Sequence, residues 1–282
     1  MAGSLYVVST PIGNLDDITV RALNTLKSVG LIAAEDTRRT GLLLRHFGIS
    51  TPTTSLHEHN EAEKLPALLQ KLADGLDIAL VSDAGTPLVA DPGQRLLAGA
   101  IQQGIRVIPI PGPSAIMAAL AASGYPADEF VFAGFAPSRS KDRKIWLERL
   151  SGEPRTVVFF ETPHRIAKTV SDMAAILVDR PITIARELTK IHEEFVRLVA
   201  RDAPTVKIQE RGEFTVVLAP YSEPSTEPQP VDDTELTLYF CQMTDFKNLS
   251  RREAVVATAT RFGLSPNDVY ARLERLKSSA PS

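Results

Sequence analysis

Short apolar runs alternate with stretches of helical periodicity along the chain as far as Leu218. An apolar run bounded by turn residues indicates a buried strand, and apolar residues three and four positions apart indicate a helix. The strands expected first are Leu5–Thr10, Leu31–Ala34, Asp77–Val81 and Arg106–Ile110. The helices expected around them are Ile18–Ser28, Thr37–Phe47, Glu61–Ala73, Gln94–Gln103 and Ile116–Ser123. The alternation predicts an α/β domain with a largely parallel sheet.

The same alternation resumes after a break at Gly124, Tyr125 and Pro126. Further strands are expected at Phe130–Phe135, Thr156–Phe160, Ile182–Glu187 and Phe214–Leu218. We therefore predict two α/β domains, at residues 1–124 and 125–220.

Two loops rich in glycine and proline directly follow predicted strands of the first domain. One runs from Ser82 to Gly93, and the other runs from Pro111 to Ala115. Open α/β sheets bind ligands at the carboxyl ends of their strands, and glycine lets backbone approach a ligand closely. One such loop alone is typical of an ordinary turn, but two together indicate a shared cleft. The residues expected to line it are Asp83, Ala84, Gly85, Thr86, Pro87, Ser114 and Ala115.

Neither loop carries a signature of nucleotide binding. The chain has no GxxxxGK motif followed by Ser or Thr, and Thr10–Asn14 reads TPIGN where a GxGxxG motif would follow the first strand. A stiff cleft with few charges suits an organic cofactor better than a nucleoside triphosphate or a dinucleotide.

Composition narrows the class of protein further. With 282 residues, of which 44% are hydrophobic, the chain can bury more than one core. Its single cysteine, Cys241, excludes an internal disulfide framework and a multi-cysteine zinc site. No apolar run approaches the length of a membrane span, so the reducing cytoplasm is the expected compartment. The formal net charge of -3 gives no overall case for nucleic-acid binding.

Two local basic patches do point to nucleic acid. The first is Ser138–Lys144, which contains Arg139 and Arg143. Such a patch can contact phosphates without reading sequence, or it can be a solvated loop and first helical turn. The second patch lies over residues 236–282, where seven Lys and Arg residues face four Asp and Glu residues.

The C-terminal region differs in kind from the α/β part. Residues 221–235 are rich in Pro, Ser, Thr and acidic residues and predict a linker. Over residues 236–282, Ser250 with Glu253 and Ser265 with Asp268 mark two helix starts. The first helix is expected to end at Gly263. The second is expected to carry four apolar or aromatic residues on one face, Val269, Tyr270, Leu273 and Leu276.

This pattern is typical of a helix-turn-helix unit. Such a unit can bind RNA through residues such as Arg251 and Arg252. Alternatively, it can be a helical cap that serves dimerisation or stability.

Five short motifs occur in an order that characterises one protein family. They are STPIGNLDDIT at Ser9–Thr19, AEDTR at Ala34–Arg38, SDAGTP from Ser82, PGPSA from Pro111 and ETPHR from Glu161. Together they resemble the tetrapyrrole methylase superfamily over about Leu5–Leu218, and within it the branch called ribosomal RNA small-subunit methyltransferase I. The first motif departs from the GxGxGD form of most porphyrin-type members, which argues against a tetrapyrrole substrate.

The resemblance implies two α/β domains with S-adenosylmethionine between them and a homodimer. It also implies methylation of a cytidine ribose 2′-oxygen in the decoding region of small-subunit (16S) ribosomal RNA. We expect Glu161, Pro163 and Thr215, at strand ends of the second domain, to contact the cofactor. No metal is expected, because His57 and His59 lack a third ligand at a familiar spacing.

Methyl transfer to a hydroxyl requires alignment of the reacting atoms and removal of one proton. Asp36, Glu161 and Glu187 are candidates for the base, and the sequence does not choose among them. We predict catalytic roles for Asp36, Glu187 and Lys190. The residues expected to contact the RNA are Arg38, Arg139, Arg143, Arg186, Arg251 and Arg252.

Two other functions remain open on the sequence. One is methylation of a small molecule of the tetrapyrrole type, against which the basic C-terminal region argues. The other is a nucleic-acid-binding protein that is not an enzyme, in which the helix-turn-helix unit does the work and the cleft is vestigial.

Overall fold

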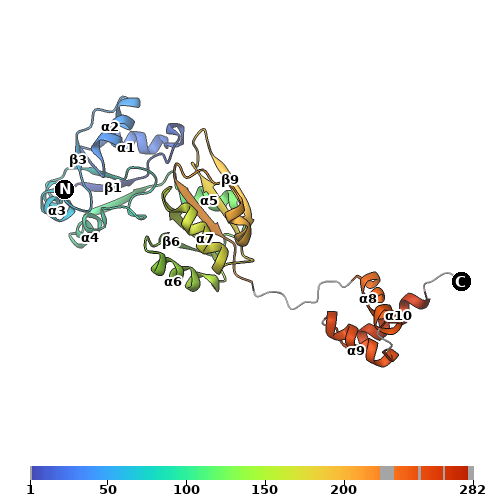
Figure 1. Ribbon diagram of the computed structural model, residues 1–282. Coiled ribbons are helices and arrows are strands. Elements are labelled where there is room, and N and C mark those ends of the chain that lie inside the picture. Colours follow the sequence, from blue (N-terminus) through green and yellow to red (C-terminus); the bar gives the residue numbers. More distant parts are fainter. Residues whose placement is uncertain (1, 223–231, 247–248, 263, 279–282) are drawn as a thin grey trace. The chain divides into compact units, whose positions relative to one another are not determined.

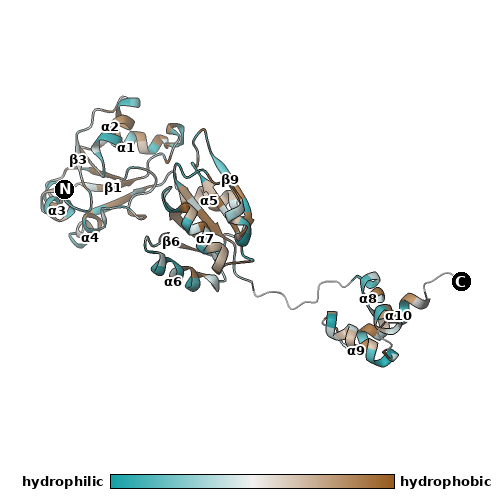
Figure 2. Cartoon of the chain, viewed as in Figure 1, coloured by the Kyte–Doolittle hydropathy of each residue, from teal (hydrophilic) through white to brown (hydrophobic). Residues whose placement is uncertain are grey.

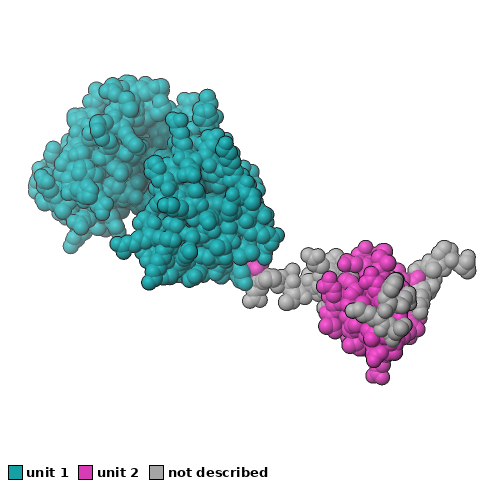
Figure 3. All heavy atoms as spheres, viewed as in Figure 1, with its two compact units in different colours: residues 1–221 teal, residues 222–282 magenta. Residues whose placement is uncertain are grey.

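The computed structural model describes residues 2–222, 232–246, 249–262 and 264–278. Residues 1–221 and 222–282 form two compact units, shown in different colours in Figure 3. Most of the expected linker, residues 223–231, lies outside the described residues, as do Lys247 and the expected helix end at Gly263. No helix within the described ranges combines the length and the apolar character that crossing a membrane requires.

The first sheet, in the unit formed by residues 1–221, is parallel throughout and has the order β3-β2-β4-β1-β5. Parallel neighbours require crossover connections, which helices provide here. The strands are β1 (Ser4–Val8), β2 (Leu31–Ala34), β3 (Thr53–Ser55), β4 (Ile78–Val81) and β5 (Arg106–Ile110) (Figure 1).

Helices cover both faces of the first sheet, because successive residues of a buried strand point to opposite sides. Ile32 and Ala79 face the layer formed by α1 and α2, while Leu31 and Ile78 face the layer formed by α3 and α4. In Figure 2 the strands are brown and the outer helices carry teal stretches. The helical elements are η1 (Leu15–Asp17), α1 (Val20–Ser28), α2 (Thr37–His46), α3 (Glu61–Ala73) and α4 (Gln94–Gln102).

The second sheet is mixed and has the order β6-β7-β10-β8-β9. β6 and β7 run parallel, whereas β10 is antiparallel to both of its neighbours and β9 is antiparallel to β8. The strands are β6 (Phe130–Phe135), β7 (Thr156–Glu161), β8 (Pro181–Arg186), β9 (Glu194–Val199) and β10 (Phe214–Leu218). Helix α5 (Ala115–Ser123) packs on one face of this sheet. The opposite face is covered by α6 (Ser140–Ser151), α7 (Ile166–Ile176) and η2 (Ala200–Thr205).

The two sheets with their helices confirm the predicted fold class, and they add two strands that the sequence pattern did not indicate. β3 has only three residues, all polar, and β9 includes the charged residues Glu194 and Arg197. Both strands lie at a sheet edge. β3 is short and polar, and charged residues interrupt the apolar positions of β9, so neither carries the continuous apolar run that indicates a buried strand.

The C-terminal unit has a small core of its own, centred on Leu236, Val255 and Leu273. The described residues of this unit form α8 (Asp233–Cys241), a π-helical turn η3 (Gln242–Phe246), α9 (Arg251–Phe262) and α10 (Pro266–Ser278). The hydroxyl of Ser265 lies 2.6 Å from the Asp268 carboxylate at the start of α10.

The pair expected at the start of α9 is also formed, because the Ser250 hydroxyl lies 2.7 Å from the Glu253 carboxylate. Tyr270 departs from the expected apolar face of α10. Its side chain is half exposed and lies under the guanidinium of Arg251.

The net charge of the C-terminal unit is lower than the sequence pattern suggested. Helix α8 begins at Asp233 behind its cap Asp232, so acidic residues that precede Leu236 belong to the unit. Residues 232–278 contain seven basic and seven acidic residues. The excess of positive charge counted from residue 236 is therefore cancelled within the folded unit.

Candidate active site between the two sheets

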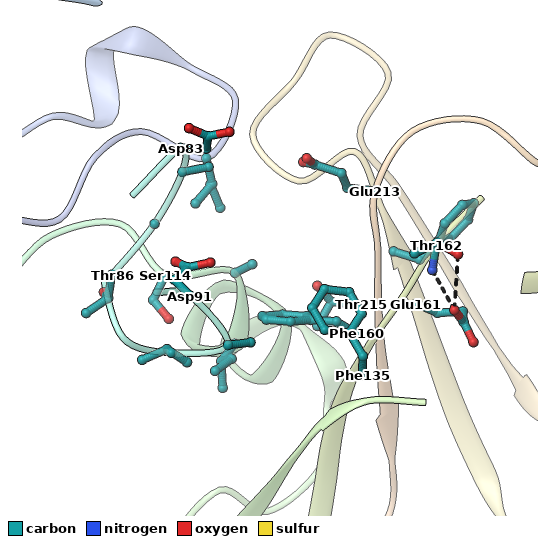
Figure 4. Close-up of a pocket in the computed structure, with 18 of the residues that line it drawn as sticks. Asp83, Thr86, Asp91, Ser114, Phe135, Phe160, Glu161, Thr162, Glu213 and Thr215 are labelled. Atoms are coloured by element: carbon teal, nitrogen blue, oxygen red, sulfur yellow. Dashed lines mark hydrogen bonds between the residues drawn. The ribbon is translucent and has the colours of Figure 1, made fainter. Parts of the chain in front are cut away.

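A cavity of about 340 Å³ lies between the two sheets. Its volume is within the range typical of sites that hold small organic ligands. The first wall, formed by loops of the first sheet and the start of α5, consists of Ile12, Glu35, Arg39, Asp83, Ala84, Gly85, Thr86, Val89, Ala90, Asp91, Ser114, Ala115 and Ile116. The second wall, formed by β6, β7, β10 and adjoining loops, consists of Phe135, Phe160, Glu161, Thr162, Pro163, Glu213, Phe214 and Thr215 (Figure 4).

Hydrogen bonds connect three loops of the first wall, which contain Thr10, Gly85 and Pro113. The backbone amide and carbonyl of Thr10 bond to the carbonyl and amide of Gly85, each at 2.9 Å. Gly85 has φ +78°, a left-handed conformation that favours glycine. The hydroxyl of Thr86 lies 3.0 Å from that of Ser9 and donates to the Pro113 carbonyl at 3.3 Å. The first wall is therefore one connected surface.

Three carboxylates and one guanidinium give the first wall its charge. The Asp83 amide donates to Glu35 at 3.2 Å, and the Asp83 carboxylate lies 3.3 Å from the Arg39 guanidinium. Burial raises the pKa of Asp91 to about 6; a hydrogen bond from Ser82 opposes the rise, and the charges of Glu35 and Asp83 add to it. Burial also raises the pKa of Glu35. The first wall thus holds a carboxylate that exchanges a proton near neutral pH.

Aromatic rings supply most of the apolar surface of the second wall, which also carries the exposed carboxylate of Glu213. The ring centroids of Phe135 and Phe160 lie 5.4 Å apart, and Phe214 and Thr215 are almost fully buried beside them. Figure 4 shows Phe135, Phe160 and Thr215 on the side of the cavity opposite Asp83 and Asp91. This wall offers a surface on which a flat ring can pack.

Glu161 belongs to the second wall, but its carboxylate serves the turn after β7. It accepts hydrogen bonds from the Thr162 amide and the Thr169 hydroxyl, both at 2.6 Å, and it pairs with Arg165 at 2.8 Å. Its side chain is 0% exposed. A carboxylate held in this way stabilises the second wall and has little capacity left for a ligand.

The family model described as Tetrapyrrole (Corrin/Porphyrin) Methylases matches residues 4–204. The chain belongs to this family. A Vibrio cholerae protein named ribosomal RNA small subunit methyltransferase I is 44% identical, over 94% of this chain and 92% of its own. A Synechocystis protein of the same name is 48% identical, over 95% of this chain and 96% of its own. The resemblance of the five motifs is confirmed.

Solved structures of other proteins share the fold of this tetrapyrrole methylase family member. The methyltransferase CobJ superposes with a TM-score of 0.59 at 17% identity, covering 78% of this chain and 95% of its own. Diphthine synthase superposes with a TM-score of 0.62, also at 17% identity, covering 77% and 90%. At this level of identity the likeness concerns the fold alone.

Most residues expected to bind the cofactor lie together. Pro87 is buried and is not part of the lining. The expected residues that line the cavity are Asp83, Ala84, Gly85, Thr86, Ser114, Ala115, Glu161, Pro163 and Thr215.

The three residues predicted to be catalytic lie outside the lining of this cavity. Hydrogen bonds from Arg38 lower the pKa of Asp36 to about 2. Glu187 pairs with Lys190 at 2.8 Å, and Lys190 also pairs with Glu213 at 3.0 Å. Burial would raise the pKa of Glu187, but hydrogen bonds from Lys190 and the Glu213 amide outweigh it and lower that pKa. Asp36 and Glu187 are therefore weak proton acceptors, and their roles stay predictions.

The arginines expected to contact RNA occupy different environments. Arg143 is 3% exposed, pairs with Asp172 at 2.6 Å and donates to the Pro137 carbonyl, so its position is structural and not open to a phosphate. Arg186 is also buried and pairs with Glu194 at 3.0 Å. The remaining arginines of the prediction are exposed: Arg38, Arg139, Arg251 and Arg252.

The sequence reasoning missed four charged residues of the lining, Glu35, Arg39, Asp91 and Glu213. Glu35 directly follows β2 within the AEDTR motif, so its place after a strand end was a usable signal. Asp91 precedes Pro92 and resembles an ordinary turn residue. Within the described ranges, no group of three or more His, Cys, Asp or Glu side chains is arranged as a metal site.

Proposed function

We propose that the protein transfers a methyl group from S-adenosylmethionine to the ribose 2′-oxygen of a cytidine in small-subunit (16S) ribosomal RNA. Membership of a methylase family and the name shared by its relatives support the reaction class and the kind of RNA. The observation that carries the proposal is a cavity with an acidic wall opposite an aromatic wall. The cytidine and the 2′-oxygen come from the resemblance of the motifs.

The chemistry of the two walls fits this cofactor. S-adenosylmethionine carries a sulfonium, an amino group, a carboxylate and an adenine ring. Glu35, Asp83 and Asp91 suit the positive groups, because opposite charges compensate for the loss of water. Arg39 suits the carboxylate, and the apolar surface around Phe160 suits the adenine ring.

When bound, the cofactor supplies an electrophilic methyl group. The walls contribute by holding the reacting groups in line, and orientation of this kind contributes about 7–11 kcal/mol in favourable cases. A ribose hydroxyl loses its proton as it becomes a nucleophile. The carboxylate oxygens of Asp91, with a pKa of about 6, are ionised at neutral pH and basic enough to accept that proton. Asp91 is therefore the first choice for the base, ahead of Asp36 and Glu187.

A small tetrapyrrole is the second candidate substrate, because the matching family is named for methylases of such compounds. Against it stands the TPIGN sequence of the first loop, which lacks the GxGxGD form. A nucleic-acid-binding protein without enzymatic activity is the third reading. Calorimetry with S-adenosylmethionine tests it, since a vestigial cavity would not bind the cofactor.

One experiment separates the two substrate classes. Cofactor labelled in the methyl group is offered to small ribosomal subunits, to free ribosomal RNA and to tetrapyrrole intermediates side by side. We expect label in the RNA, at a single cytidine whose 3′ phosphodiester resists alkaline cleavage, because that cleavage requires a free 2′-hydroxyl. Label in a tetrapyrrole would contradict the proposal, and label on a base would contradict the 2′-oxygen.

The homodimer, the cytoplasmic location and the contact of Arg251 and Arg252 with RNA belong to the same proposal. Sedimentation measures the first of these, and we expect a species of twice the mass of the chain. Salt-dependent RNA binding by an Arg251→Gln, Arg252→Gln variant measures the third, because each lost phosphate contact makes the dependence on salt shallower.

A further inference from the structure

A second cavity, of about 280 Å³, shares Asp83 and Arg39 with the first. The hydrogen-bonded pair of Thr10 and Gly85 lies between the two, since Thr10 lines the second cavity and Gly85 lines the first. The second cavity is lined by Thr10, Pro11, Leu15, Arg39, Thr40, Leu42, Leu43, His46, Ser82 and Asp83. A ligand in one cavity would therefore meet a ligand in the other beside Asp83.

The second cavity has an apolar mouth. Leu15 of η1 is 37% exposed, and Leu42 of α2 is 62% exposed. Arg39, Leu42 and His46 lie on one side of α2, because residues three and four positions apart are neighbours on a helix surface. The ring of His46 is held edge-on against Phe47, with 4.7 Å between ring centroids. Exposed apolar side chains beside an imidazole offer a surface for a flat ring.

Helix α2 is also strongly basic. It carries Arg38, Arg39, Arg45 and His46, and its sequence TRRTGLLLRH contains no acidic residue. Arg38, Arg39 and Arg45 are exposed. Positive side chains along a backbone track, next to a surface on which a base can pack, are the features with which proteins hold single nucleotides of RNA. Arg38 pairs with Asp36 and Arg39 pairs with Asp83, but both guanidiniums remain largely exposed to a phosphate. Together with Arg45 they favour an RNA nucleotide over a neutral small molecule.

We propose that the second cavity receives the base of the RNA nucleotide that is methylated, while its flanking phosphates lie along α2. Enzymes that do chemistry on a base extrude its nucleotide from the stack. Bringing the ribose of one nucleotide to a cavity displaces that nucleotide in the same way, and the displaced base then needs a pocket. The shared edge at Asp83 and Arg39 then places the ribose between the base and the cofactor cavity. The inference rests on the proposed function, because it assigns a place to the RNA substrate of that reaction.

The first test uses the full-length protein, small ribosomal subunits that lack the methyl group, and the variants Leu42→Asp and Leu15→Asp. Loss of an apolar contact with a base weakens binding by about tenfold. We expect kcat/KM for subunits to fall by about that factor in each variant, with unchanged calorimetric affinity for S-adenosylmethionine and unchanged melting temperature. Ile101→Asp is the matched control, since Ile101 is 60% exposed on α4 and lies outside both cavities.

A second test does not depend on loss of activity. A photoreactive benzoylphenylalanine replaces Leu42 in one preparation and Ile101 in another, and each is irradiated with subunits. Reverse transcription then maps the crosslinked nucleotide. We expect the crosslink from position 42 to fall on the methylated cytidine or its immediate neighbour, and we expect no crosslink there from position 101.

The outcomes separate the two proposals. If the unaltered protein does not methylate the subunits, the proposed function fails and this inference fails with it. If it methylates them while Leu42→Asp and Ile101→Asp behave alike, or while position 42 crosslinks far from the methylated nucleotide, the base pocket alone is overturned. A fall in kcat/KM together with a crosslink at the methylated site supports it.

Discussion

The two walls of the first cavity differ in kind, and the difference separates groups that can do chemistry from groups that support it. The first wall presents Glu35, Asp83 and Asp91 on loops, and the pKa of Asp91 is raised to about 6. The second wall presents aromatic rings, and its buried carboxylate, Glu161, is occupied by hydrogen bonds from its own turn. We therefore expect substitutions in the first wall to change turnover and substitutions in the second to change stability.

The topology of each sheet explains the contrast. In a parallel sheet the carboxyl ends of all strands meet at one edge, so the charged residues of several loops converge there. In the mixed second sheet, the carboxyl ends of β6 and β7 meet the amino end of β10 at the cavity, where Phe214 and Thr215 begin that strand. Fewer loops gather at this edge, and strand residues form the wall in their place.

The largest effect is expected from Asp91→Asn. If the Asp91 carboxylate accepts the ribose proton, its loss should lower kcat by about 10²–10⁴-fold. This fall should exceed the loss of cofactor affinity that comes from removing a negative charge beside the cationic cofactor. The carboxylate acts in its ionised form, so kcat/KM of the unaltered protein should rise with pH through about 6 and then level off. Steady-state rates between pH 5 and 8 measure both effects, and Asp91→Asn should lose this inflection.

The bound state gives a sharper form of the same prediction. A cationic cofactor favours the ionised carboxylate, so the inflection in kcat should lie at lower pH than the inflection in kcat/KM.

The raised pKa of Asp91 also has a consequence for stability. The ionised form is penalised on folding, so stability present below about pH 4 is lost as pH rises through about 6. If the Asp91→Asn protein keeps full turnover, the first wall does not supply the base.

Glu161→Gln tests the second wall and should act on stability. The amide cannot pair with Arg165 as the carboxylate does, and we expect the free energy of unfolding to fall by about 2 kcal/mol. Denaturant titration measures this loss. Asp179→Asn is the control, because Asp179 and its partner Arg201 are both exposed and their pair should be worth at most about 1 kcal/mol. If the Glu161→Gln protein is stable but has a greatly reduced kcat, the second wall takes part in the reaction and the two walls do not differ as proposed.

Gly85→Val should weaken the first wall as a binding surface. A β-branched residue at φ +78° is strained by about 1–3 kcal/mol, and relief of that strain moves the loop bonded to Thr10. We expect cofactor affinity, measured by calorimetry, to fall by about tenfold. Gly48→Val is the matched control: Gly48 has φ +62° with open space around it and lies outside the cavity, so stability should fall without loss of affinity.

The sequence predicted the scaffold of this site better than its chemistry. The strands β2, β5, β6 and β10 have the predicted bounds, because each is a short run of mainly apolar residues. The loop from Ser82 was identifiable from glycine and proline after such a run. Phe160 looked like an ordinary core residue, since which face of β7 meets a cavity depends on how α5 packs against the second sheet.

The charged residues show the same limit. The sequence predicts that charged residues after the strands lie close together at one edge of the sheet. It does not show which residue each of them pairs with, because the pairing depends on the tertiary structure. Asp36 was a reasonable candidate base until Arg38 was found to hold its pKa at about 2. Arg143 was a reasonable phosphate ligand until Asp172 was found beside it in the interior. Neither contact leaves a periodicity in the sequence.

The smallest effect is expected from removal of the chain after Tyr221. Every residue that lines either wall precedes that point, and the backbone amide of Tyr221 itself bonds to the Glu153 carbonyl. The shortened protein should therefore bind S-adenosylmethionine with unchanged affinity. Affinity for RNA should fall, and its dependence on salt should become shallower, only by what the phosphate contacts of Arg251 and Arg252 contribute. Residues 232–278 carry equal numbers of basic and acidic residues, so they hold no further excess of positive charge.

Binding of small subunits by both forms, at several salt concentrations, measures these differences. Loss of cofactor binding on truncation would show that the two walls do not make a complete site. A steep loss of RNA affinity would show that local groups such as Arg252 outweigh the balanced charge of the C-terminal unit. In that case the C-terminal helices, like the first wall, would carry charged groups that act on the substrate.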